Sequence, residues 1–298
     1  MTAREWGIAL LCCAMPGDCV APLTLPQLRT LRQRVLVMGM PNAPMAELRP
    51  KDLRDMGYAQ EQAEQIYHLL AREAQLEQYL NAAMAKGIHL VTRLSPDYPD
   101  RLRLLGQDAP AVLFVSGDVA LFSRAAISLV GCRDLHEPGR SFARQVGTLA
   151  AQEDYALASG NAAGADQAAQ AACLAAGGSI IAFVADELTR HLSQNPARQL
   201  MVSEGGYDLP FSNIRALRRN HFIHVQGEKC FVAQCNPGFG GTWSGTAENL
   251  RRGWTEVYVC EDGSHATELL CKRGAIPIAP ERLTSLSTLH PAQVSLFD

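Results

Sequence analysis

Two short stretches combine glycine with groups that can bind an anion, and each directly follows an apolar run. The first is Val130–Arg133, and the second is Ser159–Asp166, which precedes an alanine-rich segment. A glycine turn that opens a helix presents free backbone N–H groups, to which phosphate oxygens bind. Either stretch alone could equally be a tight turn. As anion-binding residues we assign Gly131, Arg133, Ser159, Gly160, Asn161, Gly164 and Asp166.

A third stretch, Gly238–Thr246, contains four glycines and three hydroxyl side chains. It follows an apolar run and is predicted to be a loop, with a helix from Thr246 to Arg252. Such a density of hydroxyls and backbone amides suits phosphate oxygens. Trp243 either stacks on a base or closes the loop. The phosphate-binding residues predicted here are Gly241, Thr242, Ser244 and Thr246.

Cations are concentrated in the segment Arg215–His221, which is predicted to lie in a helix. No acidic residue occurs between Asn213 and Gln226, so the segment has no carboxylate of its own to neutralise it. A basic helical face beside glycine loops could follow the backbone of a single strand of nucleic acid. The residues assigned to this contact are Arg218, Arg219 and Asn220.

These stretches need elements that bring them together, and the sequence from residue 110 provides a regular alternation. Short apolar runs are separated by segments of helical character, which is typical of parallel strands joined by helical crossovers. We therefore predict an α/β fold with a doubly wound, mostly parallel sheet. Ligands bind at the carboxyl ends of the strands in such a sheet. The predicted strands are 126–131, 155–159, 179–184, 200–203, 229–235, 256–260 and 275–278.

The chain divides into three predicted regions. Residues 1–88 form a helical N-terminal domain, in which 61–86 is rich in strong helix formers. Residues 89–280 form the α/β core. Residues 281–298 contain few candidates for a core and are predicted to be a flexible tail.

Composition narrows the function classes. The 298 residues are 47% hydrophobic and 19% charged, with a formal net charge of −3. This balance argues against coating of duplex DNA by bulk charge but leaves room for a local basic groove. The nine cysteines include no C-x-x-C pair, so we expect free thiols, no metal site and no cofactor. With no apolar stretch of about 18 residues, we expect a cytoplasmic protein without membrane association.

Taken together and in order, these segments resemble the DprA/Smf family of DNA-processing proteins, as a divergent member. The match extends over roughly residues 5–278. The resemblance implies a Rossmann-like core, binding of single-stranded DNA, and loading of a RecA-type recombinase in DNA recombination such as natural transformation. We also expect a homodimer. The matching segments are Asp97–Pro99, Pro110–Gly117, Gly131–Arg133, Ser159–Asp166, Ser203–Glu204, Arg219–His221 and Gly241–Ala247.

The chain departs from the family pattern at several positions. Cys132 replaces a serine, His221 replaces an arginine, and Ala163 stands where many members carry a basic residue. The Val-Pro-Gly expected near the end of the sheet is Val259–Gly263 here, and no winged-helix segment follows the core. The recombinase-loading role is therefore less directly implied than the fold.

Two other function classes stay open. Residues 237–242 are similar to a loop of LOG-like nucleotide phosphoribohydrolases, in which Glu248 would stabilise an oxocarbenium-like state. The spacing from Thr242 to Glu248 is three residues too long for that loop. A sensor of a free nucleotide is the third class. We find no convincing catalytic constellation and expect a protein that is not an enzyme, whose affinity for DNA rises with strand length.

The last residues, Gln293–Asp298, resemble the short peptide with which bacterial DNA-metabolism proteins bind the sliding clamp. Leu296 and Phe297 would enter an apolar pocket while Gln293 hydrogen-bonds at its edge. The alternative is a tail that packs these two side chains on its own domain.

Overall fold

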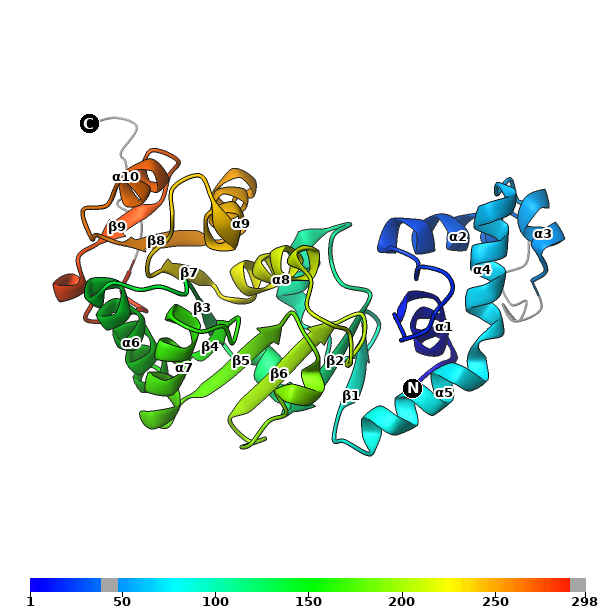
Figure 1. The fold of residues 1–298 in the computed structure, drawn as a ribbon, viewed down its shortest axis with the longest axis horizontal. Coiled ribbons are helices and arrows are strands. Elements are labelled where there is room, and N and C mark those ends of the chain that lie inside the picture. Colours follow the sequence, from blue (N-terminus) through cyan, green and yellow to red (C-terminus); the bar gives the residue numbers. More distant parts are fainter. Residues whose placement is uncertain (39–47, 290–298) are drawn as a thin grey trace.

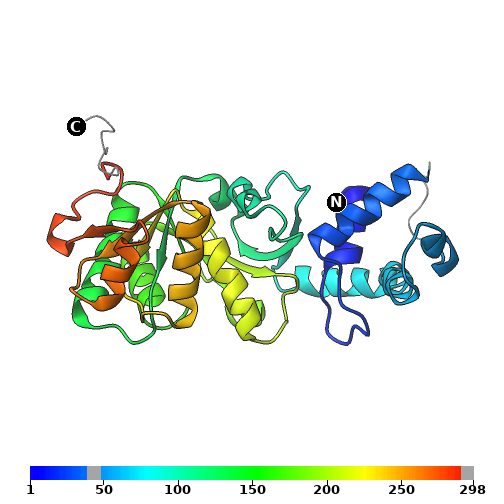
Figure 2. The same ribbon diagram turned by 90° about the horizontal axis from the view of Figure 1, so that it is seen from above.

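The computed structural model describes residues 1–38 and 48–289. Helices come first along the chain, and strands begin at residue 89. In both views α5 leads from the N-terminal helices to the first strand (Figures 1 and 2). The helices of this first part are α1 (Ala3–Cys12), α2 (Leu25–Val37), α3 (Pro50–Asp55), α4 (Gln60–Ala71) and α5 (Glu73–Met84).

Nine strands in the described residues form one sheet, in the order β1-β2-β6-β5-β4-β3-β7-β8-β9. The seven strands from β6 to β9 in this order are mutually parallel, whereas β2 runs antiparallel to both β1 and β6. The strands are β1 (His89–Thr92), β2 (Val112–Gly117), β3 (Ala126–Val130), β4 (Ala156–Ser159), β5 (Ser179–Val184), β6 (Gln199–Glu204), β7 (Lys229–Val232), β8 (Glu256–Cys260) and β9 (Ile276–Ile278).

Different helices cover the two faces of the sheet. Along β5, Ile181 and Phe183 face a core that contains Phe222 of α8 and Leu270 of α10. Ile180 faces the opposite core, which α6 and α7 cover. This division follows because successive side chains of a strand point to opposite faces. The helices of this part are α6 (Glu137–Gln152), α7 (Ala165–Ala175), α8 (Asn213–Gln226), α9 (Gly240–Arg252) and α10 (His265–Cys271).

The prediction of a doubly wound, mostly parallel α/β sheet is confirmed. The antiparallel strands β1 and β2 are absent from the list of strands predicted from the sequence. Strand β1 precedes residue 110, where the alternation begins, and β2 is not separated from β3 by an α-helix, so neither strand fits the strand–helix pattern. They extend the sheet beside β6, on the side nearest the N-terminal helices (Figure 1).

The N-terminal helices share a core with this outer part of the sheet. Val112 and Phe114 of β2 pack in one cluster with Leu11 of α1, Leu69 of α4 and Leu76 of α5. All five side chains are at most 2% exposed, so the contact excludes water. We propose residues 1–88 as a helical domain that docks on the sheet through this cluster.

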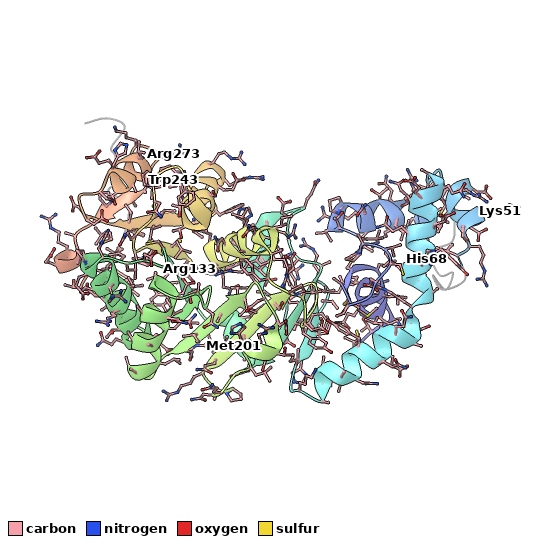
Figure 3. The ribbon with its side chains drawn as sticks, in the orientation of Figure 1. Lys51, His68, Arg133, Met201, Trp243 and Arg273 are labelled. Carbon is pink, nitrogen blue, oxygen red and sulfur yellow. The ribbon has the colours of Figure 1, made fainter. Side chains whose placement is uncertain are left out.

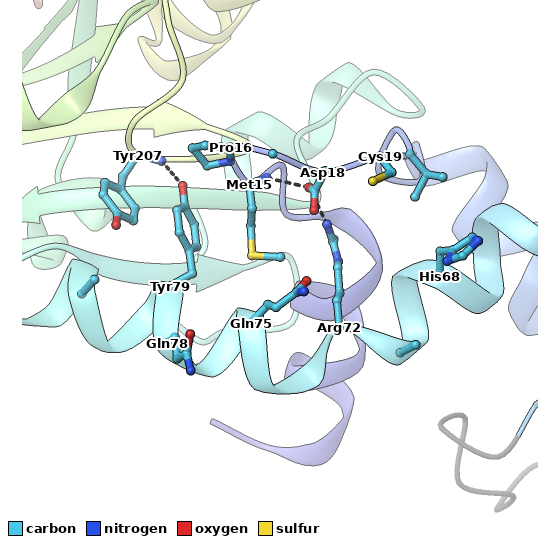
Figure 4. Close-up of a pocket in the computed structure, with 14 residues that line it drawn as sticks. Met15, Pro16, Asp18, Cys19, His68, Arg72, Gln75, Gln78, Tyr79 and Tyr207 are labelled. Atoms are coloured by element: carbon cyan, nitrogen blue, oxygen red, sulfur yellow. Dashed lines mark hydrogen bonds and ion pairs between the residues drawn. The ribbon is translucent and has the colours of Figure 1, made fainter.

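The stretch 61–86, which is rich in strong helix formers, is divided into two helices at Arg72. Its backbone leaves the helical conformation there (φ −93°, ψ 25°), between α4 and α5. The guanidinium is buried and donates to the carbonyls of Leu10 and Cys13 and to the Asp18 carboxylate, with Nη1 2.6 Å from Asp18 Oδ2 (Figure 4). Helix propensity favours a continuous helix, but these tertiary hydrogen bonds decide the local structure.

The predicted tail begins too early. Leu283 and Leu286 are fully buried against α6 and the sheet. Glu153 accepts hydrogen bonds from the backbone N–H of Leu286 and Ser287, and Lys229 donates to the Leu286 carbonyl. Two leucines spaced three apart thus anchor the segment. This pattern is too short to be recognised in a sequence that is rich in Ser and Thr. Residues Gln293, Leu296 and Phe297 lie outside the described residues.

No helix within the described ranges is both long enough and apolar enough to cross a membrane. All nine cysteines are free thiols, and six of them are buried. Among residues 1–38 and 48–289, no three His, Cys, Asp or Glu side chains form a group that could hold a metal ion.

Candidate functional site

The strand order reverses between β3 and β7. From β3 the chain adds β4, β5 and β6 on one side, and it then returns to add β7 and β8 on the other. The carboxyl ends at such a reversal are where open α/β sheets bind ligands, because the crossovers diverge and leave a crevice. All three predicted anion-binding stretches follow strands next to this point.

Gly131, directly after β3, lies in close contact with its neighbours. A Cβ added to Gly131 would be 2.3 Å from the Ala165 Cβ at the start of α7. The Thr242 hydroxyl donates to the Gly131 carbonyl at 2.9 Å, which ties the start of α9 to the end of β3. The stretches after β3, β4 and β7 therefore lie together, as the sequence predicts.

Gly164 is the residue before α7 and has a positive φ of 87°. A Cβ there would approach the Arg133 carbonyl to 2.3 Å and the Cys132 carbonyl to 2.5 Å. Only glycine combines this backbone conformation with such close packing. Arg133 itself is exposed beside this contact (Figure 3).

Arg219 of α8 reaches the loop after β4. Its side chain is 13% exposed, and Nη1 lies 3.7 Å from the Asp166 carboxylate, which is 7% exposed. A Cβ on Gly160 would lie only 1.3 Å from the same Nη1, so the guanidinium occupies space that only glycine leaves free. The Arg219 Nε is buried and has no hydrogen-bond partner among the described residues. This buried cation therefore retains an unused donor.

Burial dominates the electrostatics of this pair. Desolvation raises the pKa of Asp166, although Arg219 and the Ala162 N–H, which donates to Asp166 Oδ2 at 3.1 Å, favour its charged form. Desolvation likewise lowers the pKa of Arg219, which stays cationic because a guanidinium begins from a very high value. The pair carries almost no net charge. Binding of an anion here would therefore depend on the unused Nε of Arg219 and on nearby backbone amides.

The rest of the predicted basic face is occupied. Arg218 makes a two-pronged ion pair with Glu204 at the end of β6, and this hydrogen bonding raises the pKa of Arg218. Arg215 donates to the carbonyls of Ala185 and Leu209 and to the Ser203 hydroxyl. The expectation of a free basic face is therefore wrong for these two arginines. Their partners come from other elements, which the absence of acids within 213–226 does not exclude.

The third predicted loop is partly helix. Helix α9 begins at Gly240, so Gly241, Thr242 and Ser244 lie in its first turns and not in a loop. The first N–H groups of a helix have no partner within it and remain available to an anion. Asn220 packs against this turn, with its Nδ2 2.7 Å from where a Gly241 Cβ would be. The Ser244 side chain is exposed.

Two predicted contacts are excluded by burial. Ser159 and Thr246 are both fully buried. The Ser159 hydroxyl accepts a hydrogen bond from the Gln170 side chain, within the core beneath α7. Neither hydroxyl is available to a phosphate, because the period of the strand or helix points it inward. Their predicted roles as direct contacts are wrong.

Asp186 and His191 belong to this edge of the sheet but were not predicted. Asp186 follows β5, and His191 follows the short helical turn η4 (Leu188–Arg190). The His191 Nε2 lies 2.9 Å from both Asp186 oxygens, and its Nδ1 lies 3.2 Å from the Asn161 Nδ2. The position of Asp186 after a buried apolar strand was the one signal available for finding this cluster.

Glu248, the carboxylate of the alternative enzyme, is held by its own helix. It accepts hydrogen bonds from Arg251 and Arg252, and these bonds lower the pKa of Glu248 to about 2. A carboxylate already neutralised by two guanidinium groups is poorly suited to stabilise a developing cation.

Comparison with known proteins places the fold and the family. A family model described as DNA recombination-mediator protein A matches residues 89–279, more than half of the chain. The structure of DNA processing protein A (DprA) from Streptococcus pneumoniae is similar over 97% of both chains, with 18% identity and a TM-score of 0.72. DNA processing protein A from Helicobacter pylori, whose structure describes its single-stranded DNA binding mode, covers 64% of this chain and 90% of its own, at 18% identity and a TM-score of 0.55. No curated protein sequence matches. The chain belongs to the DNA recombination-mediator protein A (DprA) family.

Proposed function

We propose that the carboxyl edge of the sheet binds the phosphate backbone of single-stranded DNA. The observation that carries this proposal is Arg219 at the strand-order reversal, which is 13% exposed and whose buried Nε has no hydrogen-bond partner among the described residues. A charge-assisted hydrogen bond to phosphate would satisfy that donor. Family membership and the DNA-binding relative from Helicobacter pylori support the same ligand.

The proposed contacts are fewer than the sequence predicts. Arg133 supplies an exposed cation, Arg219 supplies the unused Nε, and the first N–H groups of α9 around Gly241 supply neutral donors. Arg218 is paired with Glu204 and would contact DNA only after exchanging partners. Contacts to the backbone carry no sequence information, so binding should be independent of base sequence.

Length dependence of binding tests the proposal. An oligonucleotide of about 30 nucleotides can make several phosphate contacts with the protein, whereas a mononucleotide can make only one. Affinity should therefore rise with strand length in fluorescence anisotropy measurements. Saturable binding of a mononucleotide that matches the affinity of the long strand would instead favour a nucleotide sensor.

We infer that this protein acts in DNA recombination without enzymatic activity, by loading a RecA-type recombinase or by protecting the strand. The absence of an available carboxylate at Glu248 supports a binding role. Incubation with nucleoside monophosphates should release no free base. Base release that disappears in Glu248→Gln would contradict this inference.

We also propose a homodimer as the form that contacts the recombinase. Sedimentation of the purified chain should give twice the 32.3 kDa monomer mass. A DNA-coated recombinase filament should form faster in its presence. Monomeric behaviour at all concentrations, or unchanged filament growth, would contradict the respective part of this proposal.

We further propose that the C-terminal peptide binds the sliding clamp through Gln293, Leu296 and Phe297. A peptide of residues 288–298 should bind the clamp of the host in the micromolar range, equivalent to roughly −8 kcal/mol. Leu296→Ala with Phe297→Ala should abolish binding to the clamp but leave DNA binding intact. Equal affinity for the clamp of the full-length chain and of a chain truncated before residue 288 would contradict the proposal.

A further inference from the structure

Three side chains at the strand ends form a hydrogen-bonded chain beside the proposed phosphate contacts. Asp186 follows β5, His191 follows η4, and Asn161 lies in the glycine turn after β4. The His191 ring is 25% exposed and the Asp186 side chain is 33% exposed. Asn161 has a positive φ of 56°, a conformation that asparagine tolerates better than most residues but that needs local support.

The positions of the protons in this chain follow from its geometry. Both Asp186 oxygens lie 2.9 Å from the His191 Nε2, so this nitrogen carries a proton and donates it. In a neutral ring the opposite nitrogen, Nδ1, must then be an acceptor. It lies 3.2 Å from the Asn161 Nδ2, an amide donor. The neutral ring thus holds the NH₂ group of Asn161 toward His191.

Protonation of the ring reverses the second contact. The Nδ1 becomes a donor and faces the Asn161 NH₂ group, and two donors cannot share a hydrogen bond. The amide of Asn161 must rotate so that its Oδ1 accepts from Nδ1. Rotation turns the NH₂ group away from His191, and the ring gains a positive charge at the edge of the site.

We propose that His191, held by Asp186, is a positioning residue that couples proton uptake to the orientation of Asn161 and strengthens phosphate binding at this edge. The inference rests on the proposed function because it assigns the phosphate contact to the same site.

Several charged groups surround this chain. Asp186 faces the ring directly and also interacts with Arg215 and Arg219 of α8. Glu187 and Arg190 of η4 pair with each other, at 2.7 Å. Asp166 of α7 pairs with Arg219. Most of these groups are paired with a group of opposite charge. A proton on His191 therefore raises the net charge of this edge by one.

An NMR titration tests the coupling without DNA. Between about pH 8 and pH 5.5, the side-chain amide signals of Asn161 should move along the same curve as the His191 ring. In Asp186→Ala the ring loses the acceptor of its Nε2–H, and the two curves should separate. An Asn161 amide that stays fixed while His191 titrates would overturn the proposal.

Binding of an oligothymidylate to the full-length chain tests the consequence. From about pH 8 to pH 5.5 the affinity should rise about two- to fivefold, as expected for one partly exposed charge. The log–log salt slope should steepen by about 0.7, one further counterion. His191→Gln offers an amide that cannot be protonated, so both changes should vanish. His191→Ala should bind more weakly than His191→Gln at the higher pH, because it leaves Asn161 unsupported.

A matched control uses a second histidine–carboxylate pair among the described residues, whose ring is exposed. His265 lies 3.4 Å from Glu268 on α10, and His265→Gln should retain the full pH response. Equal pH responses of His191→Gln and the parent would overturn the proposal. If Asn161 follows His191 in the NMR titration but no DNA binds at any pH, the coupling is supported and the proposed DNA-binding function is not.

Discussion

Two buried arginines occupy different regions of this molecule, and their donors are used differently. Arg72, between α4 and α5, is 5% exposed and donates to the Leu10 and Cys13 carbonyls and to Asp18 (Figure 4). Arg219, at the strand ends, is 13% exposed, has one carboxylate at 3.7 Å, and has no partner for its Nε within residues 1–38 and 48–289. The first arginine has a partner for each of its three nitrogens, and the second does not.

We propose that this difference separates a structural arginine from one that binds a ligand. Arg72 lines a cavity of about 570 Å³ between α5 and the loop after α1. Its charge there is matched by Asp18, and its hydrogen bonds fix the loop. The Arg219 guanidinium fills the space beside Gly160, and we propose that a phosphate oxygen completes its hydrogen bonding. Exposure alone does not distinguish the two, whereas the hydrogen bonds of each nitrogen do.

Replacing Arg72 should have the largest effect on stability. Arg72→Met removes the hydrogen bonds to the buried Leu10 and Cys13 carbonyls and leaves the Asp18 carboxylate with only the Met15 N–H as a partner, and breaking such a buried ion pair typically costs about 3–5 kcal/mol. Denaturant unfolding should show this loss, while DNA affinity per folded molecule stays unchanged. Arg32→Met, an exposed arginine of α2, is the control and should change stability little. A loss below about 1 kcal/mol would show that Arg72 is not structural.

Replacing Arg219 should mainly weaken DNA binding, whereas replacing Arg72 should mainly reduce stability. Arg219→Leu should weaken single-stranded DNA binding by roughly ten- to hundredfold, the value of one charge-assisted hydrogen bond of about 1.5–3 kcal/mol. Asp166 then loses the partner that favours its charged form. Because the buried group must take up a proton or remain charged, the loss of stability should be greater at neutral than at acidic pH. Unchanged DNA affinity would place the phosphate site elsewhere.

His224 tests whether an unpartnered donor alone indicates a ligand site. Its Nδ1 contacts Cys230 and Asn249, and its Nε2 is buried without a partner among the described residues. Burial lowers the pKa of His224 to about 3. The unfolded chain takes up this proton near pH 6.5, so stability should fall as pH drops from there toward 3.

The expected slope from this group is at most about 1.4 kcal/mol per pH unit. It should disappear in His224→Gln, and DNA binding by the folded variant should be retained. A pH dependence of unfolding that is identical in the parent and the variant would refute this assignment. Loss of DNA binding in the folded variant would contradict the distinction between a structural side chain, such as Arg72, and a ligand-binding side chain, such as Arg219.

The sequence predicts the parts of this site that are local in the chain. The turns at Gly131 and Gly164 could be located because glycine, strand and helix follow one another within a few residues. The pairing of Arg218 with Glu204 could not be predicted, since the carboxylate comes from another strand end. The contact between Asn161 and His191 also joins residues far apart in sequence. Tertiary packing likewise decides that Ser159 faces the core.

The most direct measurement compares salt dependence of single-stranded DNA binding in the parent and in Arg133→Ala with Arg219→Ala. Each lost phosphate contact should flatten the log–log slope by about 0.7, so the double variant should lose roughly 1.4 for every sequence tested. Arg32→Ala, an exposed arginine of α2, should leave the slope unchanged. An unchanged slope and affinity in the double variant would contradict a phosphate site at the carboxyl edge of the sheet.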